Sequence, residues 1–116
     1  MFRSMTQYER ELLDYLLEPN FPGRDALRQQ IATAHVEELD DCPCLRFHVN
    51  APVIAEVKHR IPIEAESKTG DIQVLLHVLE GRVDELEIVR ANPAKPLKMP
   101  SVNELKRFCP DNWAIE

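Results

Sequence analysis

The sequence predicts an α+β fold, in which two N-terminal helices pack on an antiparallel meander of about five strands. The clearest helical periodicity lies in the first third of the chain, whereas apolar residues alternate with period two along much of residues 33–90. Short turns separate the alternating segments, so consecutive strands are expected to pair antiparallel. A length of 116 residues suits a single domain, and we expect residues 1–116 to form one.

The two helices are expected at residues 7–18 and about 24–32. Thr6 and Glu9 have the spacing of a capping box, in which each side chain accepts a hydrogen bond from a backbone N–H of the first turn. Pro19 ends the first helix, because the residue before a proline is pushed out of the helical conformation. Apolar residues four apart indicate the buried side of the second helix.

The strands are expected where apolar and polar residues alternate between turn-forming clusters. The segments Asp40–Pro43 and Lys68–Asp71 are typical turn sequences. The five expected strands are residues 33–39, 44–50, 59–67, 72–79 and 83–90.

The last two strands allow a prediction of their register. A two-residue loop would place Leu76 opposite Glu85, whereas a three-residue loop, 80–82, places Leu76 opposite Leu86 and Val74 opposite Ile88. We predict the second arrangement, because register follows the face that is buried.

Residues 92–116 are expected to form an extended segment followed by a short helix or a docking tail. The stretch 92–100 contains three prolines, which favour extended backbone. Ser101 and Glu104 repeat the capping-box spacing and favour a short helix after Pro100.

Composition and charge exclude several classes of function. The net charge of −6 argues against nucleic-acid binding, which needs a basic surface. No apolar run is long enough for a membrane span, and the N-terminus lacks the features of a signal peptide. We therefore expect a cytoplasmic protein with no membrane or nucleic-acid partner, no cofactor and no structural disulfide.

The cysteines raise the question of a metal site. Cys42 and Cys44 are separated by one residue, whereas zinc sites usually have two to four residues between paired cysteines. We expect no metal, with a four-ligand set of Cys42, Cys44, His48 and Cys109 as the alternative, since strand alternation places Cys44 and His48 on one side.

The sequence has no nucleophile motif, phosphate loop or dinucleotide fingerprint, so no catalytic residue is predicted. In the predicted register His77 lies opposite Glu85. This pair is interpreted as an exposed cross-strand contact, with acid–base catalysis as the alternative.

Two acidic clusters are the candidate binding residues. One lies before the Cys42-Pro43 turn and the other on the last hairpin. Acidic rim residues accelerate and select encounters with basic proteins. The candidate residues are Glu37, Glu38, Asp40, Asp41, Asp84, Glu85 and Glu87.

Residues 75–105, "LLHVLEGRVDELEIVRANPAKPLKMPSVNEL", resemble the C-terminal part of a family of small uncharacterised bacterial α+β proteins. There, an apolar strand, a turn with glycine and an "ELEI" strand lead into a proline-containing segment. "ERELLDYLL" and "LDDCPCLRF" are placed compatibly in this chain. The resemblance implies an immunity-like protein without catalytic residues.

Together these observations predict a non-enzymatic interaction protein that binds a basic protein partner. A small enzyme or metal-binding domain that uses the His and Cys residues is the alternative. Pairing of exposed sheet edges would also permit a homo-oligomer.

Overall fold

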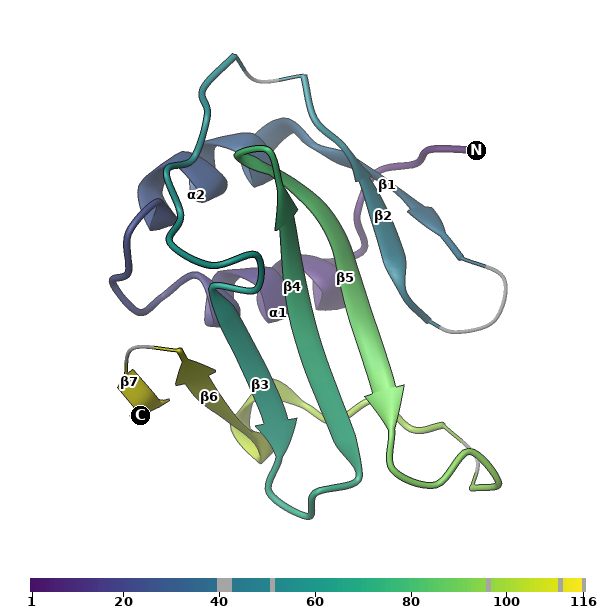
Figure 1. The fold of residues 1–116 in the computed structure, drawn as a ribbon. Coiled ribbons are helices and arrows are strands. Elements are labelled where there is room, and N and C mark those ends of the chain that lie inside the picture. The colour runs from purple at the N-terminus through teal and green to yellow at the C-terminus, as the bar shows by residue number, and fades with distance from the viewer. Residues whose placement is uncertain (40–42, 51, 96, 111, 116) are drawn as a thin grey trace.

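The computed structural model describes residues 1–39, 43–50, 52–95 and 97–110, and the backbone of residues 112–115. It confirms the α+β class, with α1 (Gln7–Leu16) and α2 (Arg24–Thr33) packed on one face of an antiparallel sheet (Figure 1). No helix among these described residues is both long and apolar enough to cross a membrane.

The N-terminus of α1 has the predicted capping box. Thr6 Oγ1 accepts a hydrogen bond from the backbone N–H of Glu9 at 3.1 Å, and Glu9 Oε1 accepts one from the N–H of Thr6 at 2.8 Å. Its leucines at positions 12, 13 and 16 are buried against the sheet. The apolar side of the helix therefore forms part of the core.

The described residues form one sheet of seven strands in the order β1-β2-β5-β4-β3-β6-β7, with neighbouring strands antiparallel. Only β3, β4 and β5 form the expected meander. The long segment 49–62 carries the chain from β2 to the far side of the β4–β5 hairpin, so β2 pairs with β5. The strands are β1 (His35–Glu38), β2 (Leu45–His48), β3 (Ile63–Ser67), β4 (Ile72–Leu79), β5 (Arg82–Arg90), β6 (Leu105–Cys109) and β7 (Asn112–Ile115).

The register of the β4–β5 hairpin is confirmed, but the predicted loop length is wrong. Leu76 lies opposite Leu86, although Leu79 pairs with Arg82 across a two-residue turn. A bulge beside His77 and Val78 restores the register, because the partner strand there carries one extra residue. The two turn residues both have positive φ, 52° and 78°, as a type I′ turn requires.

The helix expected after Pro100 is a single 3₁₀ turn, η1 (Val102–Glu104), followed directly by β6. The Ser101–Glu104 capping box forms as predicted. From Leu105 onward buried and more exposed residues alternate, and this period-two pattern suits a strand beside β3. The capping-box spacing on which the helix was predicted is satisfied by this single turn and does not require a longer helix.

Gln30 of α2 is fully buried and joins three parts of the chain. Its Nε2 donates hydrogen bonds to the carbonyls of Val53 at 3.0 Å and Gly81 at 2.8 Å. Its Oε1 accepts from the backbone N–H of Val83 at 2.9 Å. The helix layer, the segment 49–62 and the β4–β5 turn are thereby held together.

Arg107 of β6 attaches the end of α1 to the sheet. Its side chain is buried, and Nη1 donates to the Tyr15 carbonyl and to Glu18 Oε1, both at 2.8 Å. The guanidinium also lies 4.2 Å from the centre of the Tyr15 ring, a cation–π distance. The tyrosine hydroxyl in turn donates to the Leu105 carbonyl at 2.8 Å.

Replacing Gln30 with leucine is expected to lower the free energy of unfolding by about 2–3 kcal/mol, because the buried N–H of Val83 loses its acceptor. Denaturant unfolding measures this change. Gln29→Leu, on the exposed side of the same helix, is the matched control and should change stability by less than about 0.5 kcal/mol. Equal stability of the two variants would contradict the structural role of Gln30.

Candidate functional site

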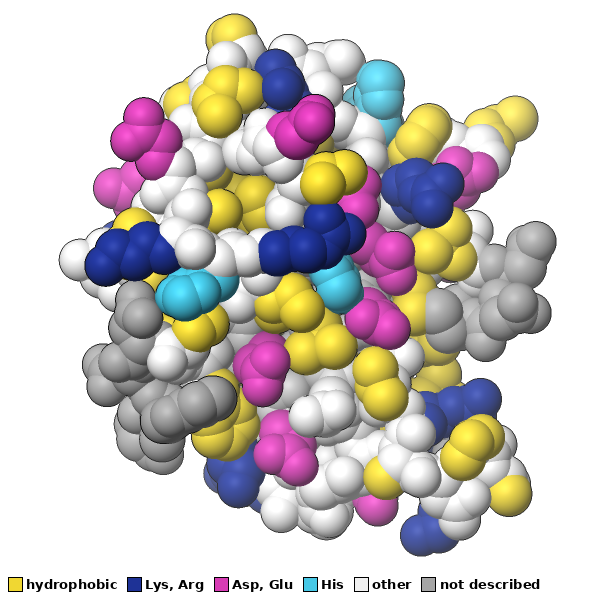
Figure 2. Space-filling view, in the orientation of Figure 1, with side chains coloured by type: hydrophobic (Ala, Val, Ile, Leu, Met, Phe, Trp, Pro, Cys, Tyr) yellow, Lys and Arg dark blue, Asp and Glu magenta, His cyan; other side chains and the backbone are white. Residues whose placement is uncertain are grey.

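The face of the sheet opposite the helices is the candidate site, and no helix among the described residues covers it (Figures 1 and 2). We call this surface the open face. Three cross-strand rows define it: Arg46–Glu85–His77, Glu87–Leu75–Glu64–Phe108 and Val89–Gln73–Glu66–Lys106.

Acidic residues outnumber basic ones in these rows. Four glutamates lie among them, against one arginine and one lysine. Figure 2 shows acidic side chains grouped beside a histidine on this face, next to hydrophobic side chains. Leu75, Val89 and Phe108 are each partly exposed, so apolar and acidic groups are both available on one surface.

His77 lies opposite Glu85 in the sheet, as predicted, but its hydrogen bond is with a different glutamate. Nε2 lies 2.8 Å from Glu87 Oε1, across the diagonal of the β4–β5 pair. The His77 side chain is 17% exposed and that of Glu87 is 39% exposed. The other ring nitrogen, Nδ1, is buried with no hydrogen-bond partner among the described residues.

The third candidate residue of the hairpin, Asp84, is the extra residue of the β-bulge. Val78 pairs with Val83 and His77 with Glu85, which leaves Asp84 without a partner in the ladder. Its carboxylate lies 3.9 Å from the Arg60 guanidinium. Asp84 thus faces a cation at one margin of the open face.

The first acidic cluster is engaged by the N-terminal segment. Glu37 Oε1 lies 3.2 Å from the amino group of Met1. Glu38 Oε1 accepts a hydrogen bond from Arg3 Nη2 at 2.8 Å. The candidates Asp40 and Asp41 lie outside the described residues. Each of the two described members, Glu37 and Glu38, has a cationic neighbour in the N-terminal segment.

Arg3 connects this cluster to α1. Its guanidinium donates two hydrogen bonds of 2.8 Å to the Glu9 carboxylate. The Arg3 guanidinium lowers the pKa of the Glu9 carboxyl below its ordinary value, against the opposing effect of burial. The N–H and C=O of Arg3 also bond to Val36, which occupies β1 at the outer edge of the sheet.

The structure does not bring together the candidate metal ligands that it describes. Cys44 is buried whereas His48 is exposed beside the Phe2 ring, so the prediction that they share one side is wrong. Cys44 precedes β2, where strand alternation does not yet apply. Three strands separate Cys109 on β6 from β2, roughly 19 Å at ordinary strand spacing.

Cys44 is disulfide-bonded, so the expectation of no disulfide is wrong. That expectation used the compartment and the odd number of cysteines, neither of which describes local geometry. A disulfide sulfur is not the thiolate that zinc requires. Cys42, the remaining candidate, lies outside the described residues, and no group of three or more potential ligands occurs within them.

The residues Glu64, Glu66 and Leu75 were not predicted as part of a site. Strand alternation alone places Leu75 on the same face as His77, and that signal was available. Glu64 and Glu66 could be placed on this face only if β3 was known to pair with β4 in the observed register.

Comparisons with protein-family models, with curated proteins and with solved structures found no match to this chain.

Replacing Glu9 with glutamine is expected to reduce the loss of stability in acid. Because its folded-state pKa is lowered, Glu9 stabilises the fold above its ordinary value of 4.5, and this contribution disappears as the pH falls through the folded pKa. The native protein should therefore lose about 1 kcal/mol more than Glu9→Gln between pH 6 and pH 3. Urea unfolding across this range measures the difference.

Glu11→Gln removes an exposed carboxylate from the same helix and controls for the change in net charge. If Glu9→Gln and the native protein show the same pH dependence, the Arg3–Glu9 pair does not contribute to folding in this way.

Proposed function

We propose that this protein is a non-enzymatic, immunity-like interaction module, which binds a basic protein partner through the open face. The observation that carries the proposal is the uncovered sheet face, where glutamates surround partly exposed apolar residues. We also propose a cytoplasmic location, although Cys44 is disulfide-bonded and cytosolic thiols usually stay reduced.

The charge of the open face supports a basic partner. Glu64 and Glu87 lie on either side of Leu75 in one cross-strand row, and Glu66 and Glu85 lie in the adjacent rows. Negative charge at this density accelerates the encounter with a positively charged surface. The net charge of −6 acts in the same direction.

Apolar residues supply the second part of the interface. Leu75 and Val89 are partly exposed on neighbouring strands. Interfaces commonly combine a desolvated apolar centre with a polar rim. A partner whose basic residues flank an apolar side chain would match this arrangement.

The His77–Glu87 hydrogen bond supports the alternative, a small enzyme. A histidine held by a carboxylate is a common acid–base arrangement. In this chain the bond lies on an open sheet surface, and the described cavities are lined by other residues. This position supports an interface residue more than a catalytic one.

Replacing Glu64 and Glu85 together with lysine is expected to slow association with the partner several-fold at low salt. The partner would be obtained by affinity capture from the native host, and rates measured by surface plasmon resonance with the purified pair. The difference should shrink as salt rises, because ions screen exposed charges beyond a Debye length of about 8–10 Å.

Glu11→Lys combined with Asp14→Lys gives the same change in net charge on the exposed side of α1, in the opposite layer of the molecule. This control should associate at nearly the native rate. If both double variants slow association equally, the effect reflects net charge and the open face is not the binding surface.

A further inference from the structure

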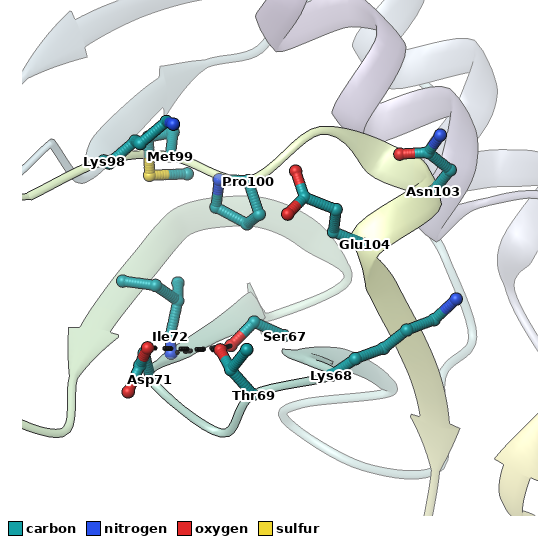
Figure 3. Close-up of a pocket in the computed structure, with 10 residues that line it drawn as sticks. All are labelled: Ser67, Lys68, Thr69, Asp71, Ile72, Lys98, Met99, Pro100, Asn103 and Glu104. Atoms are coloured by element: carbon teal, nitrogen blue, oxygen red, sulfur yellow. Dashed lines mark hydrogen bonds between the residues drawn. The ribbon is translucent and has the colours of Figure 1, made fainter.

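A cavity of about 530 Å³ lies between the β3–β4 turn and the segment 98–104, away from the centre of the open face (Figure 3). A smaller cavity of about 110 Å³ adjoins it, and Asp71, Ile72 and Lys98 contribute to both. The larger volume is in the range of small-molecule sites. The two cavities together form one elongated site.

An apolar wall separates the two cavities from the protein interior, and hydrogen bonds hold this wall in position. Ile72 is 7% exposed, Pro100 is buried, and Met99 lies beside them in the larger cavity. Tyr8 of α1 donates a hydrogen bond of 2.6 Å from its hydroxyl to the Pro100 carbonyl. Ser67 Oγ accepts from the N–H of Ile72 at 3.0 Å, which fixes the opposite wall.

The carboxylates that line the larger cavity are committed to local hydrogen bonds. Glu104 Oε1 accepts from the N–H of Ser101 at 3.0 Å and from its hydroxyl at 2.9 Å. Asp71 Oδ2 accepts from Thr69 Oγ1 at 3.2 Å. These bonds stabilise the turn and the capping box, so both acids have a structural use.

The cationic groups have no comparable use. Lys68 and Lys98 both line the larger cavity, and Figure 3 shows them on opposite sides of Glu104. Added to the capping-box hydrogen bonds, the positive charges of Lys98 and Lys68 contribute to the lowered pKa of the Glu104 carboxyl. Neither lysine forms an ion pair with a described residue. In the smaller cavity Arg90 donates to the backbone carbonyl of Lys95 at 3.3 Å, and neither the Arg90 nor the Lys95 side chain forms an ion pair with a described residue.

We propose that this elongated site binds a small organic dianion with an anionic group at each end. Across both cavities four cationic side chains accompany two carboxylates, a net charge of +2 in a protein of net charge −6. One anionic group lies between Lys98, Arg90 and Lys95, the second near Lys68, and the apolar body covers Ile72 and Met99. Charge-assisted hydrogen bonds supply most of the recognition.

Adipate is the probe, with hexanoate as a monoanion of equal chain length and inorganic phosphate as an anion without an apolar body. Each would be titrated into isotope-labelled protein at constant ionic strength, and amide NMR shifts followed. Adipate is expected to shift residues 67–72 and 98–104 saturably and to bind about tenfold more tightly than hexanoate.

Lys98→Met and Lys68→Met should each weaken adipate binding about tenfold, because each removes a cation while keeping most of the aliphatic chain. Arg82→Met, an exposed charge removal at the other end of β5, is the matched control and should leave it unchanged. The amide spectrum of each variant reports directly whether it is folded.

Three results would overturn the proposal. Hexanoate that binds as tightly as adipate would exclude a site for the second anionic group. Phosphate that binds as tightly would indicate an adventitious ion only. If Lys98→Met and Arg82→Met weaken adipate binding equally, adipate is attracted to positive charge in general and not to this site.

Discussion

The buried amide of Gln30 is the interaction on which the arrangement of the layers depends. Its nitrogen donates two hydrogen bonds and its oxygen accepts one, all with backbone groups of the segment 49–62 and the β4–β5 hairpin. The Gly81 carbonyl also accepts from the Ala55 N–H at 2.8 Å, so this glycine lies at the junction of all three segments. A Cβ atom at Gly81 would lie 2.2 Å from Ile54 Cγ2 and 3.1 Å from the Ala55 carbonyl oxygen, and the φ of 78° there also favours glycine.

This junction determines which face of the sheet is covered. The helices attach to the inner face, where Val74, Leu76 and Leu86 are buried, and the segment 49–62 bonds to the turn and to the end of β4. The alternate positions of the same strands, including Leu75 and His77, then form the open face. Period-two alternation thus links the packing of the core to the surface proposed for binding.

The sequence was sufficient for features that depend on local chemistry. The α1 capping box and the register of Leu76 with Leu86 were both predicted, because each follows from neighbouring residues or from a buried face. The hairpin loop was predicted wrongly because a two-residue turn with a bulge gives the same register as a three-residue loop. Apolar patterning does not distinguish these two solutions.

Features that depend on long-range contacts were not predictable in the same way. The pairing of β2 with β5 follows from the path of the segment 49–62, which has no periodic pattern of its own. Gln30 is an ordinary polar helix residue by sequence, and only the fold brings Val53 and Val83 to it. Likewise, the sequence did not show that Arg3, 35 residues earlier, pairs with Glu38 and compensates its charge.

The central claim is that the open face of the sheet is where a protein partner binds. Methyl NMR of the labelled protein, before and after addition of the purified partner, tests it most directly. If the partner binds the open face, the methyl signals of Leu75 and Val89 should shift strongly, while those of Leu13 and Leu27 in the helix layer change little. Unchanged Leu75 and Val89 signals in a saturated complex would contradict it.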